Sequence, residues 1–69
     1  MILISKRIKE IRTKHKLTQT EFGELFGVQK STVCSWEKGN SSPDDKIKVE
    51  ICKIFNISMD WLFGLTNKK

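Results

Sequence analysis

The stretch from Thr18 to Trp36 constrains the fold more than any other part of this chain. Thr18 and Glu21 have the T-x-x-E spacing of a capping box, in which the threonine side chain accepts an amide of the first helical turn and the glutamate accepts the amide of the threonine. Apolar residues follow at helical spacing up to Gly27, which favours a helix end because glycine adopts the left-handed backbone conformation without strain. The stretch therefore predicts a short helix over about residues 18–26.

A second short helix is expected to begin within two residues of Gly27. Its apolar residues, Val33 and Trp36, are spaced i, i+3, whereas the polar residues around them fall on other faces. Two short helices joined so closely cannot lie antiparallel, and they cross at the steep angle of a helix-turn-helix. Gly23 has no side chain and allows the second helix to pack close to the first. The second helix then presents a small, polar and cationic face to water, and such a face is suited to a DNA major groove.

Similar local signals predict three further helices. An apolar stripe at i, i+4, i+7 begins at Ile4, and Ser5 is a suitable N-cap for it. Ser42 and Pro43 predict the start of a later helix, because serine is a good cap and proline is favoured at the first helical position. The expected helices cover about residues 5–15, 18–26, 29–37, 43–56 and 59–63.

These helices, with no strand or repeat pattern, predict one all-α domain over residues 1–69, with the helix-turn-helix at about 18–37. Residues 65–69 have no periodicity and are expected to form a frayed tail. The centre of the core is expected at Ile8, Ile11, Leu17, Phe22, Leu25, Val33, Trp36, Ile51, Phe55 and Leu62.

The charge of the chain favours an anionic partner. The formal net charge is +5, and the first 16 residues hold six basic side chains against one acid, Glu10. Charge alone would more simply be read as a solvated helix face that keeps a small protein soluble. The helix-turn-helix beside it is what favours a nucleic acid.

Other classes of site have little support. Cys34 and Cys52 are 18 residues apart, which is no metal-ligand spacing, and His15 is the single histidine, so we expect no metal and no cofactor. Asp44 and Asp45 at a helix start are explained by the helix dipole, so we expect no enzyme. No run approaches the ~18 apolar residues of a membrane span, and reduced cysteines suit a cytoplasmic protein.

With these residues in view, the chain resembles the Cro/C1-type helix-turn-helix (XRE) family and, within it, the N-terminal DNA-binding domains of lambdoid phage repressors. The resemblance is carried by SKRIKEIRTKHKLTQTEFGELFGV, then STVCSWEKG, then KIFNISMDWLFG. The segments L-T-Q, G-V, W-E-K-G and D-W-L are weak singly, but their order without gaps makes the match specific. The resemblance implies a compact five-helix, lambda-repressor-like domain that binds double-stranded DNA as a homodimer on an inverted repeat.

The resemblance also implies roles by position. The groove-facing positions of the recognition helix are those of Gln29, Lys30, Ser31 and Ser35, expected to contact bases. The phosphate-contacting positions are those of Gln19, Thr32, Lys38 and Asn40. Arg12 and Glu37 occupy the positions of a buried ion pair between the first and third helices.

The segment from Asn56 to Leu65 is expected to form the dimer interface, through Met59, Trp61 and Phe63. For Trp61 a place in the core, between the fourth and fifth helices, is the alternative. Three departures from the family pattern concern Gln29, a weak cap for the third helix, Lys48, at a position that is usually leucine and that Ile47 can replace, and Cys34, which can face the groove edge or the core.

Together these observations predict a sequence-specific transcriptional regulator, a phage- or prophage-type repressor that occludes a promoter. The alternative is an antitoxin-like protein-interaction module whose DNA binding is secondary. A further C-terminal dimerisation domain that continues beyond Lys69 is also compatible with the sequence.

Overall fold

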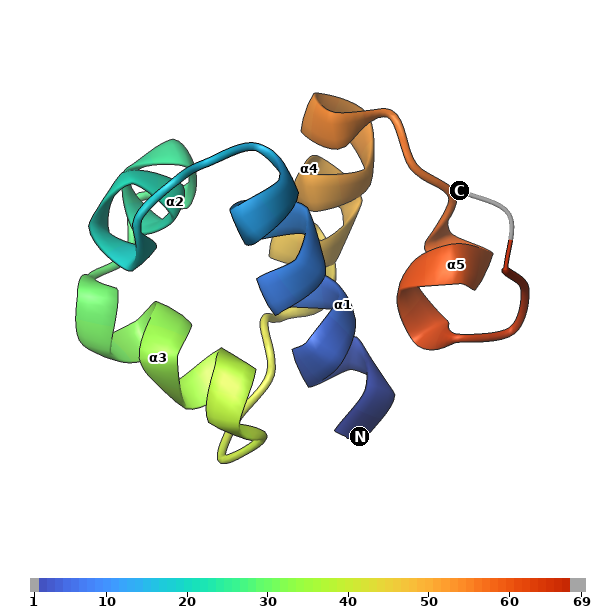
Figure 1. The fold of residues 1–69 in the computed structure, drawn as a ribbon, viewed down its shortest axis with the longest axis horizontal. Coiled ribbons are helices and arrows are strands. Elements are labelled where there is room, and N and C mark those ends of the chain that lie inside the picture. The colour runs from blue at the N-terminus through green and yellow to red at the C-terminus, as the bar shows by residue number, and fades with distance from the viewer. Residues whose placement is uncertain (1, 68–69) are drawn as a thin grey trace.

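The computed structural model describes residues 2–67, and all of the regular secondary structure within them is helical. The helices are α1 (Ile2–Lys14), α2 (Gln19–Phe26), α3 (Lys30–Lys38), α4 (Asp45–Phe55) and α5 (Met59–Phe63). Figure 1 shows α1 through the middle of the molecule, with α2 and α3 on one side of it and α5 on the other. The predicted all-α, five-helix class is confirmed.

The local signals around the turn between α2 and α3 act as predicted. The Glu21 amide donates to Thr18 Oγ1 at 3.1 Å, and the Thr18 amide donates to Glu21 Oε1 at 2.8 Å, so both halves of the capping box are present. Gly27 ends α2 with a φ of 70°. Gln29 caps α3 without a side-chain hydrogen bond, in keeping with the weak cap expected there.

Two helix starts differ from the prediction. Helix α1 begins at Ile2, so Ser5 is not its cap but lies inside the helix, 4% exposed. Helix α4 is capped by Asp44, whose Oδ1 accepts the Ile47 amide at 2.9 Å, and not by Ser42. Both Ser42 and Asp44 are good caps, and Pro43 is buried just before the helix, so packing of the loop decides between them.

The core follows the expected stripes with one error. Its buried apolar residues are Ile4, Ile8, Ile11, Phe22, Val33, Trp36, Ile51, Trp61 and Leu62, and Leu17 and Phe55 pack partly buried against them. The prediction for Leu25 is wrong, because this side chain is 46% exposed. Helix α2 turns Phe22 and Gly23 inward, and Leu25 lies well off that face.

The C-terminal segment is anchored by Trp61. This side chain is 1% exposed, so the core alternative is correct and Trp61 does not belong to a dimer surface. The amide of Leu65 donates to the Asp60 carbonyl at 2.8 Å, which closes α5. Of the expected frayed tail, residues 68–69 lie outside the described residues. Across residues 2–67 no helix is long and apolar enough to cross a membrane.

Candidate nucleic-acid interface

Gly23 of α2 lies against the backbone of the turn and a side chain of α3. The Val28 amide donates to the Gly23 carbonyl at 2.9 Å. A Cβ atom placed on Gly23 would lie 2.6 Å from the Val28 carbonyl oxygen and 3.3 Å from Val33 Cγ2. Any larger side chain would displace the turn at Val28 and crowd Val33 of α3, so this glycine allows α2 and α3 to pack closely.

Helix α3 has an inner and an outer face. Val33 and Trp36 are 0% and 3% exposed and hold the helix on the core. Lys30, Ser31 and Lys38 are exposed, and the half-buried Ser35 lies beside them. Gln29 and Asn40 are exposed at the two ends, and Thr32 is half-buried. The structure thus brings most of the predicted base-contacting residues to one polar, cationic surface.

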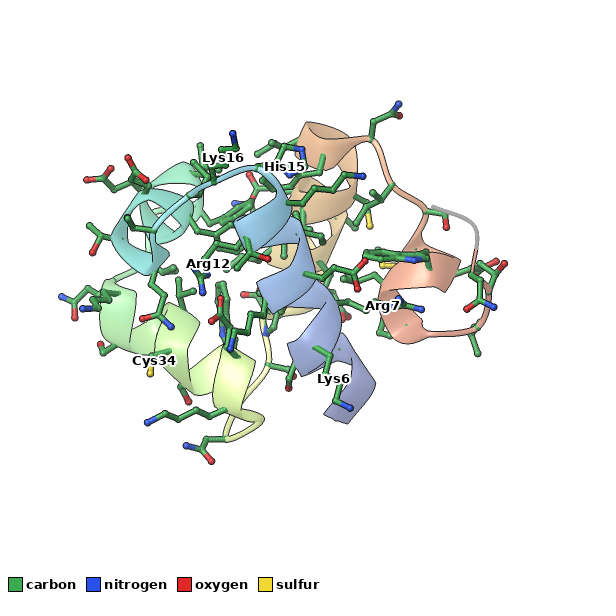
Figure 2. The ribbon with its side chains drawn as sticks, viewed as in Figure 1. Lys6, Arg7, Arg12, His15, Lys16 and Cys34 are labelled. Atoms are coloured by element: carbon green, nitrogen blue, oxygen red, sulfur yellow. The ribbon has the colours of Figure 1, made fainter. Side chains whose placement is uncertain are left out.

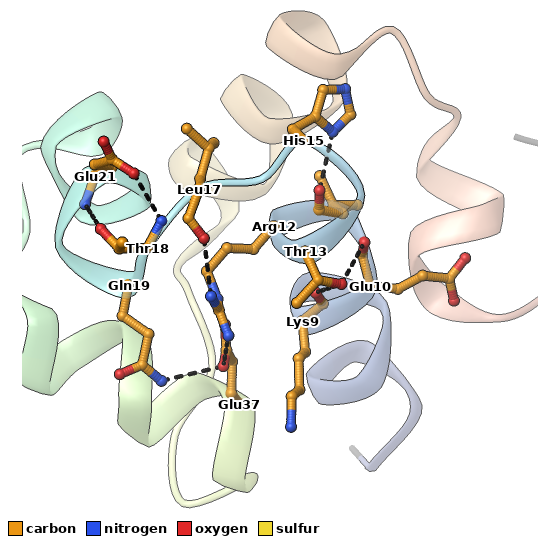
Figure 3. Close-up of polar contacts among 11 residues, drawn as sticks. Lys9, Glu10, Arg12, Thr13, His15, Leu17, Thr18, Gln19, Glu21 and Glu37 are labelled. Carbon is orange, nitrogen blue, oxygen red and sulfur yellow. Dashed lines mark hydrogen bonds and ion pairs between the residues drawn. The ribbon is translucent and has the colours of Figure 1, made fainter.

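A buried ion pair joins α1 to α3. Arg12 Nε donates to Glu37 Oε2 at 2.5 Å and Arg12 Nη2 donates to Glu37 Oε1 at 3.1 Å (Figure 3). The Arg12 and Glu37 side chains are 14% and 6% exposed. Arg12 Nη1 also donates to the Leu17 carbonyl at 2.9 Å, so the guanidinium ties the turn after α1 to the same cluster.

Gln19 belongs to this cluster as well. Its Nε2 donates to Glu37 Oε1 at 3.1 Å, from the first position of α2. An amide NH₂ group has two hydrogens, so one remains for a phosphate at the helix N-terminus. The contact with Glu37 orients the Gln19 side chain, for which the family resemblance implies a phosphate contact.

Ser41 is a residue of this surface that sequence reasoning missed. Its Oγ lies 2.8 Å from Ser35 Oγ, and the Asn40 amide donates to the Ser35 carbonyl at 3.0 Å. The signal was weak, because the loop composition does not indicate which serine returns to α3.

Three basic side chains in and just after α1, those of Lys6, Arg7 and Lys16, do not lie together. Figure 2 shows Lys6 and Lys16 near opposite ends of α1 and Arg7 beside α5. The Arg7 guanidinium carbon lies 4.3 Å from the Trp61 ring centroid, and Arg7 Nη1 lies 3.6 Å from Glu10 Oε1. Arg7 is therefore committed to packing α5 against α1.

Lys48, Ile47 and Cys34 belong to the departures from the family pattern. Ile47 packs against the core, as expected if it replaces the usual leucine. Lys48 Nζ instead lies 5.1 Å from the Phe63 ring centroid. Cys34 is half-buried on α3.

Burial raises the pKa of the Cys52 thiol, whose Sγ lies 3.9 Å from Met59 Sδ. Nowhere in residues 2–67 do three potential metal-ligating side chains come together.

Comparison with known proteins supports the geometry. Residues 8–62 match the family model described as Helix-turn-helix. An uncharacterized HTH-type transcriptional regulator of Bacillus subtilis, YgzD, is 34% identical over 62 residues, which are 90% of this chain and 94% of that protein. The antitoxin PezA of Streptococcus pneumoniae is 38% identical over 56 residues, which are 81% of this chain and 35% of PezA.

A solved structure is similar as well. The P22 c2 repressor, crystallised in complex with synthetic operator 9T, matches with a TM-score of 0.78 and 27% sequence identity. The match covers 90% of this chain and 94% of that chain. The path of the backbone and the placement of the two helices therefore follow those of a protein bound to DNA.

Proposed function

The chain belongs to the Cro/C1-type helix-turn-helix family of DNA-binding transcriptional regulators, and from this premise we propose that it is a repressor that binds an inverted-repeat operator as a dimer. The observation that carries the proposal is the outer face of α3, where Lys30 and Ser31 are exposed while Val33 and Trp36 anchor the helix. A helix held in this way offers polar side chains to base edges in the major groove.

We assign the contacts as follows. Lysine donates to guanine O6 and N7, and serine serves either kind of base edge, so Lys30, Ser31 and Ser35 read the sequence, with Gln29 beside them. Phosphate contacts from Gln19, Thr32, Lys38 and Asn40 hold the protein in register without reading bases. We further propose that residues 1–69 form a single domain and act in the cytoplasm.

Selection from a randomised duplex pool at near-physiological salt tests the whole proposal. Enrichment of an inverted repeat with half-sites about one helical turn apart is the expected result. Affinity for the enriched site is expected to fall steeply as salt rises, because bound phosphates release counterions. Enrichment of a single half-site would contradict the dimer, and no enrichment would contradict base reading altogether.

Replacing Lys30 by alanine is expected to weaken binding to the enriched site by about 1–3 kcal/mol and to relax the preference at one base pair of each half-site. Lys53→Ala is a matched control, because it removes an equal charge from the exposed last turn of α4. Quantitative binding to a panel of single-base variants separates the two effects. An equal loss for both variants at every base pair would mean that Lys30 supplies charge alone.

Replacing Phe63 by glutamate is expected to weaken self-association more than folding. Phe63 is half-buried on α5, next to Met59, and Lys48 lies over its ring, so an introduced carboxylate meets a cation within the monomer. In the dimer the same carboxylate would be buried in the apolar contact that we propose. Sedimentation velocity with Leu25→Glu as control measures the difference, since Leu25 is exposed on α2. Unchanged sedimentation of the Phe63 variant would refute this surface.

The match to PezA favours a second candidate function, an antitoxin-like module that binds a protein partner. Because the chain spans 35% of PezA, such a function would draw on regions outside the similarity or on a separate C-terminal domain. The selection experiment separates the two, because a module whose DNA binding is secondary would not enrich a long inverted repeat.

A further inference from the structure

The loop after α3 returns a second hydroxyl group to the proposed base-reading surface. The Oγ atoms of Ser35 and Ser41 lie 2.8 Å apart. The amides of Asn40 and Ser41 both donate to the Ser35 carbonyl, at 3.0 and 3.4 Å. The loop is thus fastened to α3 at Ser35, and these contacts keep the Ser41 hydroxyl beside that of Ser35.

A lone serine is a poor reader of bases. Its hydroxyl rotates and can either donate or accept, so it tolerates both kinds of base edge in the major groove. A hydrogen bond to a second hydroxyl removes this ambiguity. If Ser35 donates its proton to Ser41, only the lone pairs of Ser35 remain for a base.

Either hydroxyl can donate in this pair, so the direction of the bond depends on what else Ser41 contacts. Ser41 is exposed on the segment that follows α3, close in sequence to Lys38 and Asn40, for which we propose phosphate contacts. Phosphate oxygens only accept hydrogen bonds, so a Ser41 hydroxyl that contacts a phosphate donates its hydrogen to that phosphate. Ser35 must then supply the proton of the pair, and successive bonds in such a chain polarise one another.

We propose that Ser41 is a positioning residue that makes Ser35 a hydrogen-bond acceptor for an exocyclic amino group, adenine N6 or cytosine N4, in the major groove. The bonds run from the base amine to Ser35, from Ser35 to Ser41, and from Ser41 to a phosphate. This inference rests on the proposed function and specifies what one position of the operator must contain.

The first test compares four variants on single-base variants of the sequence that the wild-type protein enriches. Ser35→Ala identifies the base pair that Ser35 reads. Ser41→Ala is expected to lose about three- to tenfold of the discrimination at that same base pair and to keep the preferences elsewhere. Ser41→Thr, which retains the hydroxyl, is expected to restore it, and Ser42→Ala, at the exposed neighbouring serine, is expected to behave as wild type.

The second test removes the amino group from the DNA. Adenine is replaced by unsubstituted purine, or cytosine by pyrimidin-2-one, at the position assigned to Ser35. The wild-type protein is expected to lose about three- to tenfold in affinity, while Ser35→Ala and Ser41→Ala lose nothing further. A melting curve shows that each variant is folded.

The possible outcomes separate the inference from the function beneath it. Uniform weakening of Ser41→Ala at every base pair, unchanged discrimination, or a preference for a base that offers only acceptors would overturn the role of Ser41. In each of these cases the wild-type protein still enriches an operator and the proposed function stands. If the wild-type protein enriches no sequence, both fail.

Discussion

Replacing Glu37 by alanine is expected to lower the free energy of unfolding by about 3–5 kcal/mol. The Glu37 carboxylate is 6% exposed and accepts two bonds from Arg12 and one from Gln19. Without it, the Arg12 guanidinium stays largely buried and keeps the Leu17 carbonyl as an acceptor. Most of the loss comes from this stranded charge, because the intact pair offsets only part of its own desolvation.

Denaturant titration followed by circular dichroism measures the effect. Glu24→Ala removes an exposed carboxylate from α2 and is expected to change stability by no more than about 0.5 kcal/mol. Glu37→Gln keeps the shape and an acceptor oxygen and is expected to fall between the two. A loss below about 1 kcal/mol for Glu37→Ala would mean that water reaches Arg12 and that the pair is effectively a surface one.

The position of the Arg12–Glu37 ion pair also has a consequence for DNA binding. It connects α1 to α3 through Arg12 and Glu37, and it reaches α2 through Gln19. The proposed phosphate contact of Gln19 and the orientation of α3 therefore share one buried carboxylate. We expect a variant that remains folded to lose affinity for all operator sequences alike, because positioning is disturbed while the base-reading side chains are intact.

The helices could be predicted from the sequence because their signals are local. The capping box at Thr18 and the helix end at Gly27 each depend on residues within one turn, and the structure contains both. The prediction for the start of α4 was wrong because the local signals there are ambiguous. Two adequate caps, Ser42 and Asp44, lie two residues apart, and no local rule says which of them begins the helix.

Features that depend on tertiary packing were harder to predict. Leu25 matched the helical spacing, but the inward face of α2 is set by the close approach of Gly23 to α3. The place of Ser41 on this surface could not be predicted, because only the structure shows that the loop after α3 returns to Ser35. The Arg12–Glu37 contact came from the family resemblance, since 25 residues separate the partners and no local rule links them.

Replacing Trp61 by alanine is expected to cost about 3–5 kcal/mol of stability and to weaken self-association as well. Trp61 is 1% exposed and is the largest fully buried side chain among the described residues. Helix α5 has five residues, too few to be stable without tertiary packing. When its anchor is removed, the helix is expected to detach together with Met59 and Phe63, on which the proposed dimer surface depends.

The contact between Arg7 and Trp61 allows a second, independent test of the role of Trp61. Its guanidinium carbon lies 4.3 Å from the Trp61 ring centroid, and its Nε is buried without a hydrogen-bond partner, so the ring face is a principal compensation for that cation. The losses from Arg7→Ala and Trp61→Ala should therefore be less than additive, by about 0.5–2 kcal/mol in a double-mutant cycle. Leu25→Ala, at a side chain that is 46% exposed on α2 and outside the proposed dimer surface, is the control and should leave both stability and sedimentation nearly unchanged. Strict additivity of the two losses would show that Arg7 and Trp61 pack side by side without energetic coupling.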